Sequence, residues 1–422
     1  MVWLGACSKQ ERTMKLNPIA IAALITSIIG LSAFDGYSAQ VINSSKVILS
    51  QTDMPSVTPQ QAIARILNSR KLKAEWFAPD FLVKVPLPKM EEIIANMQIA
   101  VGKCRQIQDQ DVSYLAMCDR GNIPVKIKLN SEGKVTAIFF AKHQQTFEQA
   151  VSSFKELEGD VSLLVMEGKN QRAGIRADDP MAVGSAFKLA VLKALKNQIA
   201  DGKITWGQVV SLQAKQQSFP TGILQDWSAG SLLTVQTLAS LMISISDNTA
   251  TDALIDLVGK KEVERFTLRN RPFLKTREMF TLRGSKNAEL LKKYRLANIS
   301  DRLQILKTIS SQELPDILEF VKSPKISLDI EWIFTVRELC SLIEDVADLP
   351  LMSFNSGLAD PTEWKKVSFK GGSDAGVLNF TTLLQSKNGK SYCVSTTWNH
   401  TSPVSEAKLA TLYKGLIDTL SQ

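Results

Sequence analysis

Residues 185–200 are the stretch that most constrains the fold, because they are predicted to form a helix that is apolar on almost every side. Its apolar side chains are Ala186, Phe187, Leu189, Ala190, Val191, Leu192 and Leu195. A helix without a polar face is stable in water only when other elements surround it, so it belongs inside a core. Asp201-Gly202 ends the helix. The chain therefore has to build a layered domain around this segment.

The length and composition are those of a globular protein with more than one folded part. The chain has 422 residues, of which 44% are hydrophobic and 22% charged, so a large core is available and wholesale disorder is excluded. At this length we expect two folded units, or one large unit with additions. The net charge is +8, but no long Lys/Arg run or basic helix is present, so we expect no nucleic-acid partner.

The histidine content limits the chemistry. His143 and His400 are the two histidines of the chain, they lie far apart, and no HExxH or CxxC pattern occurs. The sequence therefore argues against a zinc site, and it implies no metal or organic cofactor. A Ser-His-Asp triad would have to use His143 or His400 as its histidine.

The N-terminus is predicted to be an export signal over residues 1–39. Lys15 precedes an apolar run at residues 18–34, and small residues follow at Gly36, Ser38 and Ala39. A basic start, a short apolar stretch and small residues at the cleavage site are typical of secretory signals. Residues 40–57 would then be a linker, and the mature chain is expected to be periplasmic or secreted. An uncleaved signal is the alternative, and it is the only membrane link that we expect.

Four cysteines would remain after the loss of Cys7, namely Cys104, Cys118, Cys340 and Cys393. An even number fits an oxidising compartment. Cys104 and Cys118 are close enough in sequence to pair across neighbouring strands. Four buried free thiols are the alternative.

Residues 58–145 are predicted to form a small α+β domain. Its expected elements are helices at 59–67 and 89–99 and strands at 113–118, 124–129 and 134–141. A turn at 130–133 joins the last two strands.

Residues 146–422 are predicted to form a second, larger domain. Its expected strands are 160–166, 172–176, 375–384 and 391–398, and its expected helices, besides 185–200, are 234–244, 248–258, 289–296, 300–309 and 405–420. Strands at both ends with helices between them indicate one sheet built from the two ends. The predicted fold class is therefore α/β (α+β), with an antiparallel sheet flanked by helices.

Ser185 and Lys188 form a Ser-x-x-Lys pattern at the start of the apolar helix. A serine in the first turn lies near free backbone N–H groups, and a lysine three residues later lies on the same face. Burial and neighbouring positive charge push such a lysine toward its neutral form, which can take the serine's proton without a histidine. The bare pattern is weak, since it recurs at Ser131/Lys134, Ser152/Lys155 and Ser405/Lys408. Ser131 lies in a turn, and the other two lack an apolar helix.

Ser246-Asp247-Asn248 stands at the start of another predicted helix. Its structural interpretation is an N-cap. Its functional interpretation makes Ser246 a proton relay toward the leaving group and Asn248 a partner of Lys188 or of the substrate amide, with Asp247 bracing the loop.

Lys370-Gly371-Gly372-Ser373 precedes the final hairpin. Gly371 and Gly372 would let a substrate backbone lie close to a strand. Lys370 could bind a carboxylate or tune Ser246, and the backbone N–H of Ser373, with that of Ser185, could form an oxyanion hole. A glycine-rich surface turn is the alternative.

Three weak patterns in this order form a specific set, S-x-x-K with S-D-N and K-T-G, known from class A β-lactamases and penicillin-binding proteins. Residues 154–422 resemble a class A β-lactamase-type catalytic domain of the penicillin-recognising serine enzymes, and the resemblance is strongest at residues 181–189 and 245–250. It implies a β-lactamase/transpeptidase-like fold and an acyl-enzyme on Ser185. The expected substrate is a small β-lactam or a related amide or ester.

Two departures from the family pattern bear on turnover. Gly371 stands where the family usually has a hydroxyl residue, and no glutamate is followed shortly by the Leu-Asn pair that accompanies the family's deacylation base. Glu278 and Glu289 are the nearest candidates, and Glu278 is the possible water-activating base that we retain. The interval from Ser246 to Lys370 is also longer than usual, so the intervening lobe is enlarged.

The two-part layout, with Lys-Gly-Gly-Ser as third motif, is similar to that of the two-domain serine hydrolase of the clavulanic acid gene cluster. That resemblance implies an NTF2-like fold for residues 58–145 and an esterase-like activity. The rival interpretations are a D,D-peptidase acting on peptidoglycan, a β-lactam sensor that stays acylated, and a non-catalytic scaffold.

Overall fold

The computed structural model describes residues 57–322 and 326–421. The predicted export signal, Cys7 and nearly all of the predicted linker lie outside these residues. Within them, no helix is both long enough and apolar enough to cross a lipid bilayer. The described residues make up one compact unit, and the division at residue 145 stays a prediction.

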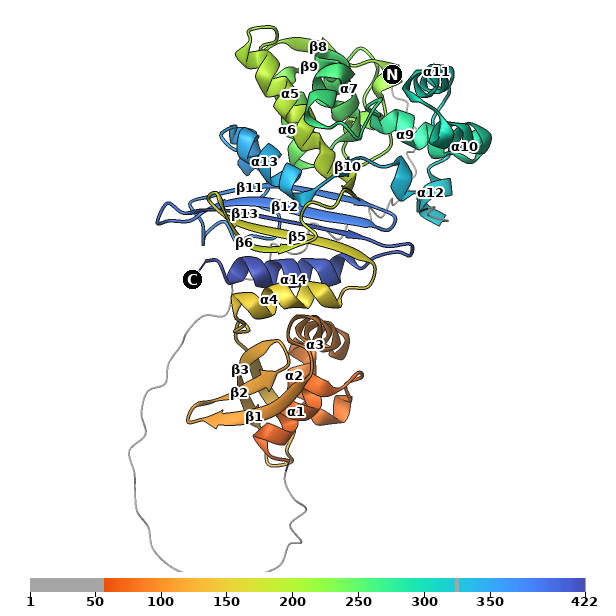
Figure 1. Ribbon diagram of the computed structural model, residues 1–422. Coiled ribbons are helices and arrows are strands. Elements are labelled where there is room, and N and C mark those ends of the chain that lie inside the picture. Colours follow the sequence, from red (N-terminus) through yellow and green to blue (C-terminus); the bar gives the residue numbers. More distant parts are fainter. Residues whose placement is uncertain (1–56, 323–325, 422) are drawn as a thin grey trace, which may run out of the picture. The chain divides into compact units, whose positions relative to one another are not determined.

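Residues 57–141 contain helices followed by an antiparallel meander (Figure 1). The elements are α1 (Pro59–Asn68), α2 (Pro79–Lys84), α3 (Leu87–Val101), β1 (Cys104–Gln110), β2 (Ser113–Cys118), β3 (Gly121–Leu129) and β4 (Val135–Phe140). The strands pair in sequence order, and the helices pack on the sheet over a core of their own that includes Ile63, Ile94 and Val125. The predicted α+β character is confirmed, whereas the NTF2-like fold stays a prediction.

Sequence reasoning missed β1 in this part of the chain. The strand reads Cys-Arg-Gln-Ile-Gln-Asp-Gln, and almost all of its side chains are exposed or half-buried. It lies at the edge of the sheet and pairs only with β2. An edge strand with both faces largely in water carries no alternating apolar pattern to detect.

The larger part of the chain is built on a five-stranded sheet. Its order is β11 (Lys366–Asp374), β12 (Val377–Gln385), β13 (Ser391–Asn399), β5 (Asp160–Glu167) and β6 (Asn170–Ile175), with every neighbouring pair antiparallel. Strands from the two ends of this part therefore meet at β13 and β5, where Val394 is opposite Val165. The predicted fold class and the prediction of one sheet from both ends are confirmed.

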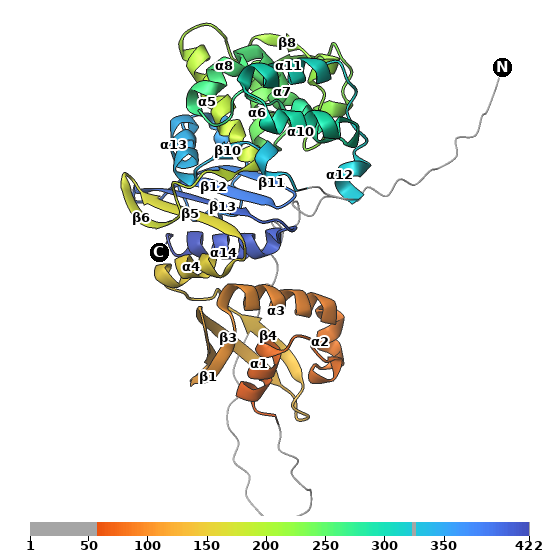
Figure 2. The same cartoon turned by 45° about the vertical axis from the view of Figure 1, so that its right-hand side comes forward.

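Helices cover both faces of this sheet (Figures 1 and 2). On one face, α4 (Phe147–Ser153) and α14 (Glu406–Asp418) enclose a core with Leu163, Phe380 and Tyr413. On the other face, α5 (Lys188–Ala200) and α13 (Val336–Val346) lead into a helical lobe, and seven of the thirteen α5 residues are buried. The apolar segment 185–200 is thus a core element as predicted, but its first turn is a 3-10 helix over Gly184–Phe187, and α5 begins at Lys188.

In the described part of the chain, the helical lobe contains one α-helix that precedes the second motif and six that begin within it or follow it. They are α6 (Val235–Ser244), α7 (Asn248–Val258), α8 (Lys260–Val263), α9 (Thr276–Arg283), α10 (Ala288–Leu296), α11 (Ile299–Ile309) and α12 (Leu318–Lys322). Two short antiparallel pairs complete the fold, β7 (Met181–Ala182) with β10 (Ile333–Phe334) and β8 (Val209–Ser211) with β9 (Leu232–Thr234). The β7–β10 pair matters most, because it leads directly into Ser185.

Two disulfides join the four cysteines that the structure describes. Cys104–Cys118 links β1 to β2, as the sequence had suggested, and Cys340–Cys393 links α13 to β13. The alternative of four free thiols is wrong.

Loss of the Cys340–Cys393 bridge is expected to destabilise the larger part of the chain. The bridge spans 53 residues, so its removal by the double substitution Cys340→Ala/Cys393→Ala is expected to cost about 4 kcal/mol, through greater freedom of the unfolded chain. Urea unfolding of the variant and the wild type measures this difference. A loss below about 1 kcal/mol would contradict the prediction.

Candidate active site

Ser185 is held where a short strand turns into the core helix. β7 pairs with β10, Gly184 adopts a positive φ of 51°, and Ser185 follows in the 3-10 turn. Phe187 anchors this turn, because its ring stacks on Trp332 at a centroid distance of 3.8 Å. Ser185 itself stays half-buried, unlike Ala186, Phe187 and Lys188, which are fully buried.

Lys188 is fully buried and meets four oxygen atoms. Its Nζ lies 3.2 Å from Ser185 Oγ, 2.6 Å from the Ser246 carbonyl oxygen, 3.0 Å from Ser246 Oγ and 2.6 Å from Asn248 Oδ1. Burial lowers the pKa of Lys188 well below its ordinary value, and the positive charge of Lys370 lowers it further. A neutral amine has two N–H donors and one lone pair. It can therefore donate to Asn248 Oδ1 and the Ser246 carbonyl while it accepts the proton of Ser185.

Ser246-Asp247-Asn248 combines the N-cap with the contacts to Lys188. The Asp247 carboxylate accepts from the backbone N–H of Ala250 at 2.8 Å and caps α7. Its second oxygen accepts the N–H groups of Ile223 and Leu224, which ties the neighbouring loop to the motif. With the backbone held in this way, Ser246 adopts a positive φ of 58°, an uncommon conformation for a residue other than glycine.

Asn248 and Ser246 both turn toward the amine of Lys188. The side-chain amide of Asn248 donates to the Phe219 carbonyl at 3.1 Å, which leaves its oxygen directed at Lys188. The structural and functional interpretations of this motif are therefore compatible, since Asp247 forms the cap and its two neighbours reach Lys188.

The third motif is part of edge strand β11, and the alternative of a surface turn is wrong. Lys370 is buried, and its Nζ lies 3.0 Å from Ser246 Oγ and 2.6 Å from the Gly371 carbonyl oxygen. Burial lowers the pKa of Lys370 to about 7. The Ser246 hydroxyl thus lies between two amines, each 3.0 Å away.

β11 approaches the nucleophile segment backbone to backbone. A Cβ at Gly372 would lie 2.0 Å from the Val183 carbonyl oxygen and 2.7 Å from Ser185 N, and a Cβ at Gly184 would lie 2.8 Å from Ser373 N. The backbone nitrogens of Ser185 and Ser373 therefore belong to two facing segments. Only a residue without a side chain fits at Gly372.

Gly372→Ala is expected to push β11 away from the nucleophile segment. Covalent labelling of Ser185 by an active-site probe should slow by about 100-fold or more, because small displacements of reacting groups have effects of this size. The matched control is Gly207→Ala, where a new Cβ meets no atom within 4 Å. Equal labelling rates in the two variants, measured by intact-protein mass over time, would contradict the prediction.

Glu278 is not part of the serine–lysine cluster. Its carboxylate is bound to Lys260 Nζ at 2.7 and 2.5 Å and to the Lys275 backbone N–H at 2.8 Å, which closes a capping box at the start of α9. Glu289 is exposed and paired with Lys292. No hydrogen bond among the described residues connects either glutamate to Lys188.

Sequence reasoning missed the carboxylates that the fold places near the cluster. Asp252 follows Asn248 by one helical turn and is fully buried, which raises its pKa to about 7 although it accepts the backbone N–H groups of Thr276 and Arg277. The one signal in the sequence was its position four residues after Asn248, which places both side chains on the same face of the helix. The pair of Glu331, which is buried, and Asp374, which is half-buried, left no local signal, because the two residues and Arg283 are distant in sequence.

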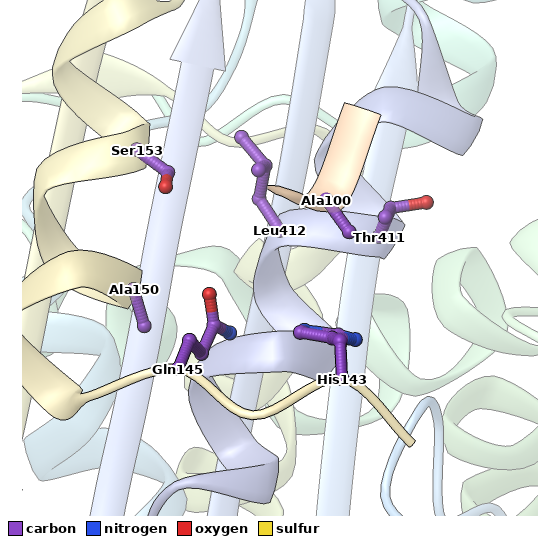
Figure 3. A pocket seen from close by; sticks show the side chains of 7 residues that line it. All are labelled: Ala100, His143, Gln145, Ala150, Ser153, Thr411 and Leu412. Carbon is purple, nitrogen blue, oxygen red and sulfur yellow. The ribbon is translucent and has the colours of Figure 1, made fainter. Parts of the chain in front are cut away.

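Neither histidine meets Ser185 in the described part of the chain. His143 lines a narrow crevice with Gln145, Ser153 of α4 and Leu412 of α14 (Figure 3). This crevice has no room for a water molecule. Burial lowers the pKa of His143. His400 Nδ1 accepts the backbone N–H of Ser402. A Ser-His-Asp triad at Ser185 is therefore excluded, and no described group of three His, Cys, Asp or Glu side chains is arranged to hold a metal ion.

Comparison with known proteins gives one family match and several similar folds. A search of curated proteins found no match. Among solved structures, one titled "Structure of PBP-A" is 16% identical with a TM-score of 0.45, and the alignment covers 65% of this chain and 94% of that one. A β-lactamase from Sphaerobacter thermophilus DSM 20745 is 18% identical with a TM-score of 0.46, over 65% and 94% of the two chains. An ancestral class A β-lactamase is 15% identical with a TM-score of 0.45, over 65% and 100%.

The family match covers the nucleophile and the second motif. Residues 142–323 match the family described as "Beta-lactamase enzyme family". That segment includes Ser185, Lys188, Ser246 and Asn248, whereas β11 lies beyond its end. The matched segment thus contains Lys188 and the two serines in contact with it, Ser185 and Ser246, whereas Lys370 and Ser373 lie outside it.

Proposed function

We propose that this protein is an exported serine hydrolase that forms an acyl-enzyme on Ser185 and hydrolyses β-lactams or a related amide or ester. The observation that carries the proposal is the distance of 3.2 Å between Ser185 Oγ and the fully buried amine of Lys188. A base with a strongly lowered pKa next to the hydroxyl is the arrangement that activates a serine without a histidine.

In the acylation step, Ser185 Oγ attacks the carbonyl carbon of the substrate. The hydroxyl proton passes to the neutral amine of Lys188, and the negative charge on the carbonyl oxygen is held by the backbone N–H groups of Ser185 and Ser373. The bond to the leaving group then breaks. Ser246 donates its hydroxyl proton to the leaving group and is then reprotonated by Lys188, so Lys188 is neutral again at the end of the step. Lys370 favours this relay electrostatically from the other side of Ser246.

In the deacylation step, water attacks the acyl carbonyl, and its proton moves through Lys188 to Ser185 Oγ as the acid departs. No carboxylate is available for this task in the described cluster. Asp247 and Asp252 accept backbone N–H groups, and Glu278 is paired with Lys260. We therefore expect deacylation to be slow, which supports a second candidate function, a β-lactam-binding protein that stays acylated.

The contacts of Lys370 support a role in tuning Ser246 over direct binding of a substrate carboxylate. Its amine bonds to Ser246 Oγ and to the Gly371 carbonyl, and with a pKa of about 7 it is charged only part of the time at neutral pH. Gly371 adds no hydroxyl beside it. Uncharged esters are for this reason included among the proposed substrates, together with a peptidoglycan peptide as the D,D-peptidase alternative.

Export to the periplasm or the medium is part of the same proposal. The two disulfides support it, because such bridges persist in oxidising compartments. The predicted signal at residues 1–39 supports it from the sequence.

The experiment that tests the proposal is intact-protein mass spectrometry over time. The chain lacking residues 1–39 is mixed separately with a penicillin, a cephalosporin, a p-nitrophenyl ester and a D-Ala-D-Ala peptide. An adduct on Ser185 is expected with at least one of them. An adduct that clears within seconds identifies a hydrolase for that compound, and one that persists identifies a binding protein. The absence of any adduct, with no compound consumed, would contradict the proposal.

A further inference from the structure

Three charged side chains, two of them buried and one half-buried, meet beside the third motif. Arg283 of α9 lies between Glu331, which precedes β10, and Asp374, the last residue of β11. Its Nη1 is 3.4 Å from Glu331 Oε1 and forms a shorter hydrogen bond with Asp374 Oδ2. The side chains of Arg283 and Glu331 are 3% and 2% exposed, and that of Asp374 is 24% exposed. The mechanism proposed above uses none of these groups.

One arginine cannot neutralise two ionised carboxylates, so the group retains a proton. Burial raises the pKa of Glu331 well above its ordinary value, and the negative charge of Asp374 raises it further. Burial alone would raise the pKa of Asp374 too, but the hydrogen bond from Glu331 and the charge of Arg283 lower it. Glu331 therefore holds the proton and shares it with the Asp374 carboxylate.

The two carboxyl groups connect the two segments that carry the oxyanion donors. Asp374 directly follows Ser373 in β11. Glu331 directly precedes Trp332, whose carbonyl accepts the Val183 N–H at 3.0 Å and whose ring stacks on Phe187. Glu331 is thus linked through Trp332 to the turn that carries Ser185, and Asp374 belongs to the strand that carries Ser373.

We propose that Glu331 and Asp374, sharing one proton under Arg283, are positioning residues that set the spacing between the backbone N–H groups of Ser185 and Ser373. The inference rests on the proposed acyl transfer at Ser185. While the proton is present, the hydrogen bond draws the two segments together. When the proton is lost at alkaline pH, two carboxylates face one arginine and repel each other. The segments then separate, and stabilisation of the oxyanion weakens.

The test is the pH profile of Ser185 labelling by an uncharged fluorophosphonate, measured between pH 6 and 10 on the chain lacking residues 1–39. Wild type is expected to lose labelling rate at the alkaline end. Glu331→Gln keeps a hydrogen-bond donor that does not titrate, so its rate should stay within about threefold of wild type at pH 7 and lack the alkaline loss. The matched control is Glu313→Gln, which removes an exposed carboxylate and should follow the wild-type profile.

Two further variants keep the test decisive. Asp374→Asn also leaves one carboxyl group for the arginine, so it should remove the alkaline loss if Glu331→Gln does not fold. Glu331→Ala removes the hydrogen bond and should lower kcat for an ester by about tenfold or more with little change in KM, as expected for a contact that acts in the transition state.

An alkaline loss in Glu331→Gln equal to that of wild type would overturn the inference, as would a wild-type kcat in Glu331→Ala. Such results, with Ser185 still labelled, leave the proposed function intact. Absence of labelling in every protein at every pH would instead overturn the proposed function itself.

Discussion

Ser185→Ala is expected to abolish any covalent labelling by β-lactams, esters and fluorophosphonates, which is the largest effect we expect from any single substitution. The alanine removes the half-buried hydroxyl that lies 3.2 Å from the buried amine of Lys188 at the start of the core helix. The missing oxygen lies in a 3-10 turn whose packing depends on Phe187, so the fold should be retained. Intact-protein mass after incubation measures the adduct, and thermal unfolding checks the fold.

The chain offers a matched control for this substitution. Ser152 and Lys155 repeat the Ser-x-x-Lys spacing on the surface, where both residues are exposed. Ser152→Ala should therefore label at the wild-type rate. An adduct that persists in Ser185→Ala, located on another residue by peptide mapping, would overturn the assignment of the nucleophile.

Lys188→Met is expected to lower the rate of acylation by about 10²–10⁴-fold, the usual contribution of a positioned general base. Methionine fills the buried space with an unbranched chain of similar length but cannot accept the Ser185 proton. The wild-type rate should also fall at acidic pH, where the amine becomes protonated. Because burial lowers the pKa of Lys188 below its ordinary value, this loss occurs at a lower pH than for an exposed lysine. Stopped-flow measurement of the acylation rate with an ester, repeated at a series of pH values, measures both effects.

The control for this prediction is Lys155→Met, on the exposed Ser-x-x-Lys pair, which should change neither the rate nor its pH dependence. A Lys188→Met variant that is folded and acylates as fast as wild type would show that another group takes the proton. Lys370 would then be the next candidate, since its amine is 3.0 Å from Ser246 Oγ and its pKa is about 7.

The deacylation base shows where sequence reasoning reached its limit. Glu278 was a reasonable candidate by position, but it is the third residue of α9, and its carboxylate closes the capping box there. The same carboxylate also forms an ion pair with Lys260. Both partners depend on how α8 and α9 pack, which a local pattern does not encode.

The sequence by itself determined many of the elements and the three motifs, although it did not reveal the edge strands β1 and β11. The all-round apolar segment had to become a core helix, because no other location buries Leu189, Val191 and Leu195. The Ser-Asp-Asn motif had to start a helix, and α7 begins at Asn248. The final hairpin was expected to share a sheet with the strand near residue 160, and β13 pairs with β5. Each of these features depends on residues that are close in sequence or on simple burial.

Only the tertiary structure decided how these pieces act together. Folding brings the amines of Lys188 and Lys370 each to 3.0 Å from Ser246 Oγ, although 58 residues separate Lys188 from Ser246 and 124 separate Ser246 from Lys370. It also buries both amines, and that loss of water is what lowers the pKa of each lysine. The shared proton of Glu331 and Asp374 arises in the same way. Distances between remote side chains and the dielectric around them are properties of packing, so they exist only once the chain has folded.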